Sequence, residues 1–97
     1  MKQNRISRSA RNQECTARLS GYCDPSTVVL AHAPFTGRHG SRQNWIWSAY
    51  LCVDCHDRMD NRTMRIYTQA EMRELWYEAI NRTQQLLIEQ GLIKVIL

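Results

Sequence analysis

The sequence predicts a small α+β domain that is held together by a bound zinc ion and completed by a long C-terminal helix. Two short runs, residues 27–33 and 45–52, are rich in β-branched, aromatic and other apolar side chains, which favours strands. A helical repeat with start and stop signals covers residues 68–91. Four cysteines in two pairs flank the predicted strands.

The small size of the chain explains why it needs these cysteines. A chain of 97 residues with 43% apolar side chains buries too little surface to be stable without a metal, a disulfide or a partner subunit. The start MKQNRISRSARN lacks the apolar stretch of an export signal, so we expect a cytoplasmic location. No apolar run approaches the length of a membrane span. In a reducing cytosol, two cysteine pairs favour zinc ligation over two disulfides.

Two strands and a loop are predicted between the cysteine pairs. The run TVVLAHA, residues 27–33, ends at a proline, which cannot continue a strand ladder. Residues 35–44 contain two glycines and polar side chains and predict a loop. The run WIWSAYLC, residues 45–52, predicts a second strand with Trp45 and Trp47 on one face. We expect both indoles in the core; a stacking platform for single-stranded bases is the alternative.

A long helix is predicted in the last third of the chain. Thr68 and Glu71 have the spacing of a capping box, and Gly91 supplies a stop signal. One face of the helix carries the apolar stripe of Met72, Leu75, Trp76, Ala79, Ile80, Thr83, Leu86 and Leu87. The stripe predicts core packing or a dimer interface. The ending LIKVIL predicts a strand or a docked tail, where a partner chain could also add.

Positive charge is concentrated in the first half of the chain. Residues 1–50 carry seven Lys and Arg against two acids, whereas residues 51–97 carry six against seven. Arg5, Arg8 and Arg11 recur at every third position, and such a cationic arm would gain affinity for DNA by releasing counterions. A solubilising tail is the alternative interpretation.

The chain is therefore expected to form a single domain with three parts. These are a basic arm at residues 1–12, either flexible or a frayed helix, a zinc-stabilised core at residues 13–66, and a helix with an apolar tail at residues 67–97 packed on the core.

The four cysteines predict a closed, structural zinc site. Cys52 and Cys55 form a C-x-x-C turn, which lets two sulfurs reach one metal. Seven residues separate Cys15 from Cys23, and Gly21 between them would allow the loop to bring both sulfurs together. Four thiolates complete a tetrahedral shell. Four buried free cysteines are the alternative.

A second metal site is predicted directly after the C-x-x-C turn. If a helix begins there and continues to about residue 60, His56 and Asp60 lie one turn apart on one face and could hold a divalent ion, Mg²⁺ or Mn²⁺. A surface histidine or an alternative zinc ligand would also fit His56. His32 lies near the end of the first predicted strand, where a packed core histidine is the ordinary interpretation. The order of strand histidine, loop, strand, zinc turn and helix histidine, however, is typical of a ββα-metal nuclease.

The segments ECTARLSGYC, TVVLAH and LCVDCHDRMDNR resemble the HNH-type endonucleases with a cysteine-zinc scaffold, especially the small YbcO-like nucleases of phages and prophages. This resemblance implies a treble-clef-like fold, one structural zinc and a catalytic divalent ion. It implies that His32 is the general base, that His56 binds the catalytic ion and that Asn44 is the middle asparagine that orients the base. Many HNH enzymes have an acidic metal ligand where this chain has Ala31, so either Asp60 replaces that ligand or the activity is weak or absent.

The sequence thus predicts a metal-dependent endonuclease that hydrolyses phosphodiester bonds in DNA. His32 would take a proton from water, since histidine exchanges protons near neutral pH, and His39 is a rival for this role. Arg38 and Arg42, in the loop, could clamp phosphates or be solvated. A non-catalytic zinc finger of the same fold that binds DNA or protein is the first alternative. A structural assembly protein that forms a homodimer through its C-terminal helix or tail is the second.

Overall fold

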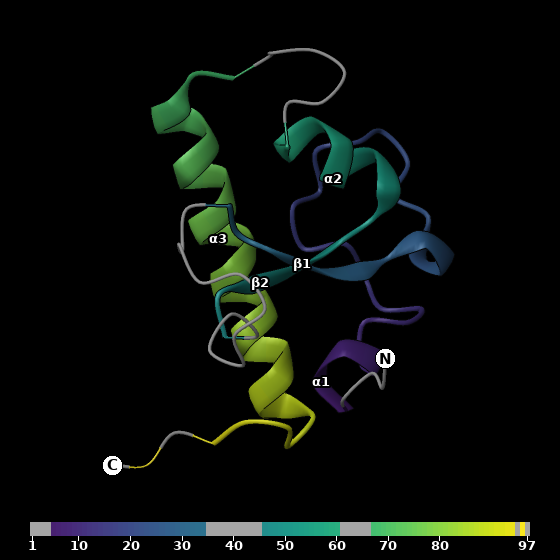
Figure 1. Cartoon of the computed structure of the whole chain (residues 1–97). Helices are drawn as coiled ribbons and strands as arrows, with labels where there is room; N and C mark the ends of the chain where they lie inside the picture. The colour runs from purple at the N-terminus through teal and green to yellow at the C-terminus, as the bar shows by residue number, and fades with distance from the viewer. Residues whose placement is uncertain (1–4, 35–45, 61–66, 95, 97) are drawn as a thin grey trace.

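A computed structural model describes residues 5–34, 46–60, 67–94 and 96. Its elements, in chain order, are α1 (Arg5–Arg8), the 3-10 helix η1 (Pro25–Thr27), β1 (Val29–His32), β2 (Ser48–Leu51), α2 (Val53–Met59) and α3 (Gln69–Glu89). Figure 1 shows α3 along one side of the molecule, with the two strands crossing beside its middle and α2 and α1 beyond opposite sides of them. This arrangement confirms the α+β class and the long C-terminal helix.

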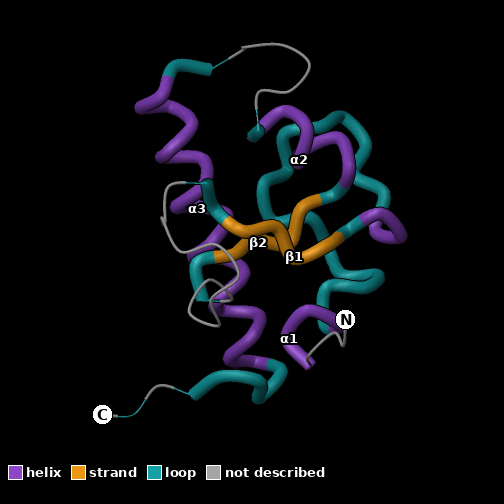
Figure 2. The backbone as a smooth tube through the Cα atoms, viewed as in Figure 1, coloured by secondary structure: helices purple, strands orange, loops and turns teal. Residues whose placement is uncertain are grey.

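The two strands form one antiparallel hairpin in the centre of the molecule (Figure 2). The register pairs Val29 with Leu51 and His32 with Ser48. β1 is shorter than predicted because Asp24 caps η1: its carboxylate accepts from the Ser26 amide at 3.0 Å and diverts residues 25–27 from the strand.

Helix α3 begins and ends as the sequence predicts. The Glu71 amide donates to the Thr68 hydroxyl, and the Glu71 carboxylate accepts from the Thr68 amide, which lowers the pKa of Glu71. At the other end Gly91 has a φ of 73°. The amides of Gly91 and Leu92 donate to the carbonyls of Ile88 and Leu87 at 3.0 Å each. These two bonds are those of a Schellman motif, so glycine is required by the left-handed backbone.

The apolar stripe of α3 packs inside the chain. Its buried members are Met72, Trp76, Ala79, Ile80, Thr83 and Leu87. β2 lies against this stripe, and all four of its residues are buried. A homodimer formed through α3 would therefore have to use other side chains, such as Ile88, which is 38% exposed. Leu92 and Ile93 of the predicted tail pack partly on the core, whereas Ile96 is exposed.

Buried threonines satisfy the outer edge of β2. The Tyr50 amide donates to the Thr83 hydroxyl at 3.0 Å, and that hydroxyl donates to the Ala79 carbonyl at 2.8 Å. The Tyr50 carbonyl accepts from the amide and hydroxyl of Thr16, at 2.8 and 3.0 Å. In the described chain, the edge of β2 away from β1 is thus satisfied at Tyr50 by Thr16 and Thr83 rather than by a third strand.

The basic arm is folded onto the core where the structure describes it. Arg5–Arg8 form one helical turn, which agrees with the helical alternative, and Ala10 behind it is 1% exposed. The Ser9 hydroxyl lies 2.6 Å from the Tyr50 hydroxyl, which also accepts from the Gln90 side chain at 3.1 Å. These contacts connect the arm, β2 and the end of α3.

The expectation that Trp47 lies in the core is wrong. Its side chain is 46% exposed, because β2 begins one residue later and only the Trp47 backbone joins the hairpin, through its carbonyl and the Ala33 amide. Trp45 lies outside the described residues. Across the described part of the chain, no helix is both long and apolar enough to cross a membrane.

We predict that Thr83→Val destabilises the fold by about 1–3 kcal/mol, because valine keeps the shape of the side chain but leaves the buried Tyr50 amide without an acceptor. Urea unfolding at saturating zinc measures the loss. The exposed neighbour Gln85→Ala is the control and should change stability by no more than about 0.5 kcal/mol. Equal stability of the two variants would contradict the role of Thr83.

Candidate metal centre and histidine site

The structure brings all four cysteines together. Their sulfur atoms lie within 4.8 Å of one another, and the Cys23 and Cys55 sulfurs are 3.7 Å apart. Cys15, Cys52 and Cys55 are buried, and Cys23 is half-buried. All four are free thiols, so no disulfide competes for them.

This geometry fits a tetrahedral zinc ion. Zinc–sulfur bonds of about 2.3 Å in a tetrahedron separate neighbouring sulfurs by about 3.8 Å. The 3.7 Å between Cys23 and Cys55 matches that value. The cluster therefore has the ligand type, number and spacing of a structural zinc site, as the sequence predicts.

Local backbone structure brings each pair into place. Cys52 is the N-cap of α2, and its sulfur accepts from the Cys55 amide at 3.4 Å. In the first pair, Arg18 adopts a left-handed φ of 57°, and the Ser20 hydroxyl accepts from the Tyr22 amide at 3.2 Å. This turn folds the seven residues between Cys15 and Cys23 back on themselves, so that the two sulfurs lie close together despite their wide spacing in the sequence.

Without a metal, the thiols share their protons unequally. The Cys55 thiol donates to the Cys15 sulfur, which lowers the pKa of Cys15 to about 4 and raises that of Cys55. Burial raises the pKa of Cys23 to about 11. Four such groups cannot ionise together at neutral pH unless a cation neutralises them, which is what zinc would do.

The second feature is His32 at the end of β1. Its Nδ1 lies 2.6 Å from the hydroxyl of Ser48, which is fully buried. The bond follows from the register. Tyr50 directs its amide and carbonyl away from β1, and the Ala33 amide bonds the Trp47 carbonyl, so His32 and Ser48 form a non-hydrogen-bonded pair. Side chains of such pairs approach closely.

The third feature is a pair on α2. The His56 Nε2 lies 3.1 Å from an Asp60 carboxylate oxygen, and the two side chains are 29% and 19% exposed. The structure thus brings together the two residues predicted to share an ion. Within the described residues, no third His, Cys, Asp or Glu joins them in a ligand cluster.

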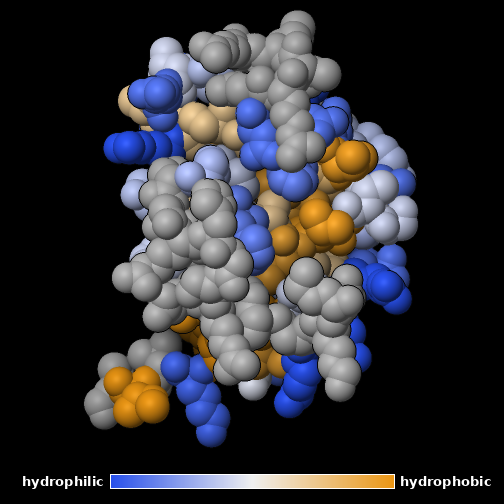
Figure 3. All heavy atoms as spheres, in the orientation of Figure 1, coloured by the Kyte–Doolittle hydropathy of each residue, from blue (hydrophilic) through white to orange (hydrophobic). Residues whose placement is uncertain are grey.

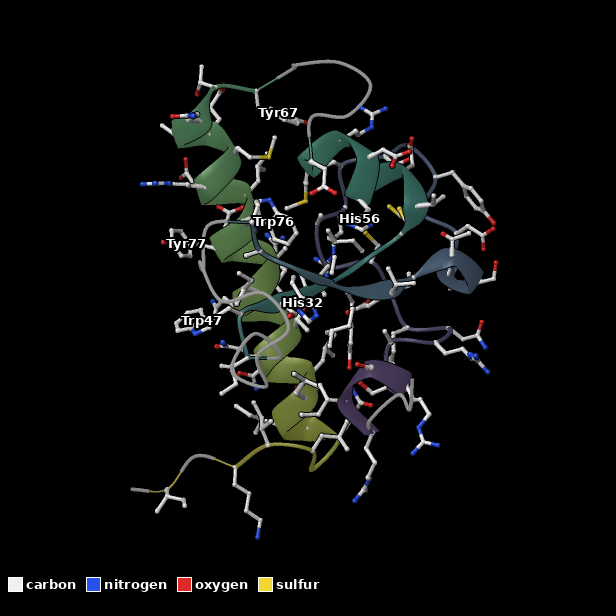
Figure 4. The ribbon with its side chains drawn as sticks, in the orientation of Figure 1. His32, Trp47, His56, Tyr67, Trp76 and Tyr77 are labelled. Carbon is white, nitrogen blue, oxygen red and sulfur yellow. The ribbon has the colours of Figure 1, made fainter. Side chains whose placement is uncertain are left out.

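The two histidines lie on different elements, His32 at the end of β1 and His56 on α2. Figure 4 labels His32 on the strand that crosses the molecule and His56 on α2. His56 follows Cys55 directly in α2, so the position of His56 depends on the cysteine cluster. Ala31 is 3% exposed and faces the core, on the opposite side of β1 from His32. Position 31 therefore supplies no carboxylate to the face of β1 that carries His32.

The structure describes some of the remaining predicted site residues but not others. Arg5, Arg8 and Arg11 are exposed on α1 and the turn after it. Asn44, Arg38, Arg42 and the rival base His39 lie outside the described residues. Ser48 was not predicted as a site residue. Only the register of the two strands, which pairs Ser48 with His32, could have indicated its role.

Comparison with known proteins shows the family of the chain. A family model described as "Putative nuclease YbcO" matches residues 4–92. The chain belongs to the YbcO family. A curated relative, "Putative nuclease ybcO" of Enterobacteria phage 82, is 33% identical over 93 residues, which are 92% of this chain and 96% of the relative. A solved structure, described as that of "a putative bacteriophage protein from Escherichia coli str. K-12 substr. MG1655", matches with a TM-score of 0.67 and 30% identity, over 88% of this chain and 98% of the other.

We predict that the chain binds one zinc ion and that Cys55→Ser lowers the free energy of unfolding by several kcal/mol, on the order of the loss expected for a broken structural site. Metal analysis of the purified protein and thermal unfolding measure the two effects. Val53→Ser, which introduces the same residue at a neighbouring exposed position, is the control and should keep the zinc. A stable, zinc-free wild-type protein would contradict the assignment.

Proposed function

We propose that the protein is a metal-dependent endonuclease that hydrolyses phosphodiester bonds in DNA, in the cytoplasm of a bacterium that carries the phage or prophage. Support comes from its membership of the YbcO family, whose curated phage member carries the name of a nuclease. The observation that carries the proposal is the hydrogen bond between His32 and Ser48. It holds an exposed histidine at the end of β1, the strand that pairs with β2, which runs directly into α2 with His56 and Asp60.

In this proposal His32 is the general base. If its Nδ1–H donates to the Ser48 oxygen, the lone pair lies on Nε2, which makes no hydrogen bond with the described residues. Nε2 would then take the proton of the attacking water while Ser48 holds the ring in that tautomer and orientation. Ser48 is thus a positioning residue that acts through His32.

His56 and Asp60 would hold the catalytic ion, Mg²⁺ or Mn²⁺. Ligands about 2.1 Å from an octahedral ion lie about 3.0 Å apart when adjacent, and the Nε2 and carboxylate oxygen are 3.1 Å apart. When bound, such an ion stabilises the negative charge of the phosphate and of the leaving oxygen. Substrate phosphate and water would complete its shell, since the described chain supplies two ligands. Asn44 would orient the base, and Arg38 and Arg42 would contact phosphates, as the resemblance and the loop position suggest.

A non-catalytic zinc finger of the same fold is the second candidate. Ala31 favours this candidate. Many HNH enzymes have an acidic metal ligand at this position, whereas Ala31 is buried and has no carboxylate. In that case the two histidines would be surface residues, and binding of DNA or protein would be the whole function.

We predict that zinc-loaded protein nicks supercoiled plasmid DNA only when Mg²⁺ or Mn²⁺ is added. His32→Ala and His56→Ala should each reduce the nicking rate by at least about 10²-fold, since each removes a proton acceptor or an ion ligand. Zinc content and circular dichroism of both variants should match the wild type. Wild-type protein that binds DNA but cuts no form of it with any ion would favour the zinc finger.

We predict that Ser48→Ala lowers the single-turnover cleavage rate by about tenfold, the equivalent of one orienting hydrogen bond, and leaves DNA affinity unchanged. Thr83→Val, which also loses a buried hydroxyl but lies away from His32, should keep the wild-type rate at a temperature where both variants are folded. Equal rates for Ser48→Ala and wild type would show that Ser48 does not position the base.

A further inference from the structure

A groove with two arginines runs along the free edge of β1. It has a volume of about 360 Å³ and lies between α1 with its following turn and the strand. Its lining consists of Ser7, Arg8, Arg11, Ser26, Val28, Val29 and Leu30. Arg8 also borders a second hollow of about 310 Å³, which Arg5 and Gln90 line from the other side.

The arginines of this groove are available to an anion. Arg8 and Arg11 are exposed, and neither forms an ion pair with a carboxylate of the described residues. No Asp or Glu is in the groove lining. Asp24, two residues before Ser26 in the sequence, accepts hydrogen bonds from the amide and the hydroxyl of Ser26. The groove therefore has net positive charge, which suits phosphate groups.

The groove is built on fixed elements. Ala10 is buried between Arg8 and Arg11, and the Ser9 hydroxyl is anchored to the Tyr50 hydroxyl of the hairpin. Asn12 then adopts a left-handed φ of 61° and turns the chain away. Because the backbone that carries the arginines is already held in this way, little backbone conformational entropy would be lost on binding.

The groove leads along β1 toward His32. Val28, Leu30 and His32 share a strand face by alternation, and the first two line the groove. Leu30 and His32 are about 6.6 Å apart along the strand, so the end of the groove lies close to the histidine. The register also turns the Leu30 amide away from β2, toward this edge. Figure 3 shows apolar surface over the hairpin bordered by hydrophilic residues, and the exposed Val29 forms part of the groove wall.

We infer that this groove binds the sugar-phosphate backbone of the DNA strand that is cut, a few nucleotides from the bond at His32. Arg8 and Arg11 contact its phosphates, and the apolar wall of β1 lies against the sugars. The inference rests on the proposed function for the position of the cut, but the binding itself requires no cleavage. The binding is independent of base sequence, since the lining offers charge and backbone rather than an array of base-reading side chains.

The test is DNA binding without a divalent ion, measured by fluorescence anisotropy with a short labelled duplex and the matching single strand. The proteins are the zinc-loaded wild type, an Arg8→Gln/Arg11→Gln double variant and Arg73→Gln. Arg73 is an exposed arginine of α3 outside the groove, so its variant shows how losing one positive charge elsewhere on the surface affects binding. Zinc content and circular dichroism establish that all three are folded.

We expect the double variant to bind the duplex more weakly and to lose about 0.9 in the slope of log affinity against log salt for each arginine. Arg73→Gln should stay close to the wild type. If the double variant binds both DNA forms as Arg73→Gln does, or if the wild type binds neither, the inference is overturned.

A cleavage assay on the same proteins separates this inference from the proposed function. If the double variant binds DNA more weakly but the wild type cleaves no DNA with any ion, DNA binding by the groove is supported and the nuclease function is overturned. If instead the wild type cleaves DNA and the double variant binds and cleaves it equally well, the nuclease is supported and the groove is overturned.

Discussion

Convergence of four cysteine sulfurs on one point is the constraint on which the rest of this structure depends. Cys15 and Cys23 lie in irregular segments before the hairpin, whereas Cys52 and Cys55 begin α2 after it. A zinc ion bound there would tie the segments before and after the hairpin together and would fix the start of α2. Because His56 follows a ligand directly, the same ion that stabilises the fold sets the place of the proposed catalytic pair.

Helix α3 supports this small centre from the other side. Its buried stripe covers β2, and Thr83 and Thr16 take the place of a neighbouring strand at the outer edge of Tyr50. Since β2 is buried along its whole length, the register with β1 is well defined, and that register brings Ser48 to His32. Stability and proposed chemistry therefore depend on the same strand.

The sequence predicted well the features that local physics controls. The capping box at Thr68, the stop at Gly91 and the C-x-x-C turn are set by residues close in the chain, and the structure contains each of them. It failed for Trp47, because whether an indole enters a core depends on where the hairpin ladder starts. Ser48 could not be named either, since its contact with His32 spans 16 residues and depends on register. Likewise the groove beside Arg8 exists only once α1 is packed on β1.

The central claim is that α2 serves two metals, a zinc ion on its cysteines and a divalent ion on His56 and Asp60. Equilibrium binding of Mn²⁺ to zinc-loaded protein, followed by electron paramagnetic resonance, tests it most directly. Our account predicts one Mn²⁺ per chain, lost in Asp60→Asn while the zinc is retained. Mn²⁺ binding that persists in this variant, or no binding to the wild type with DNA present, would contradict it.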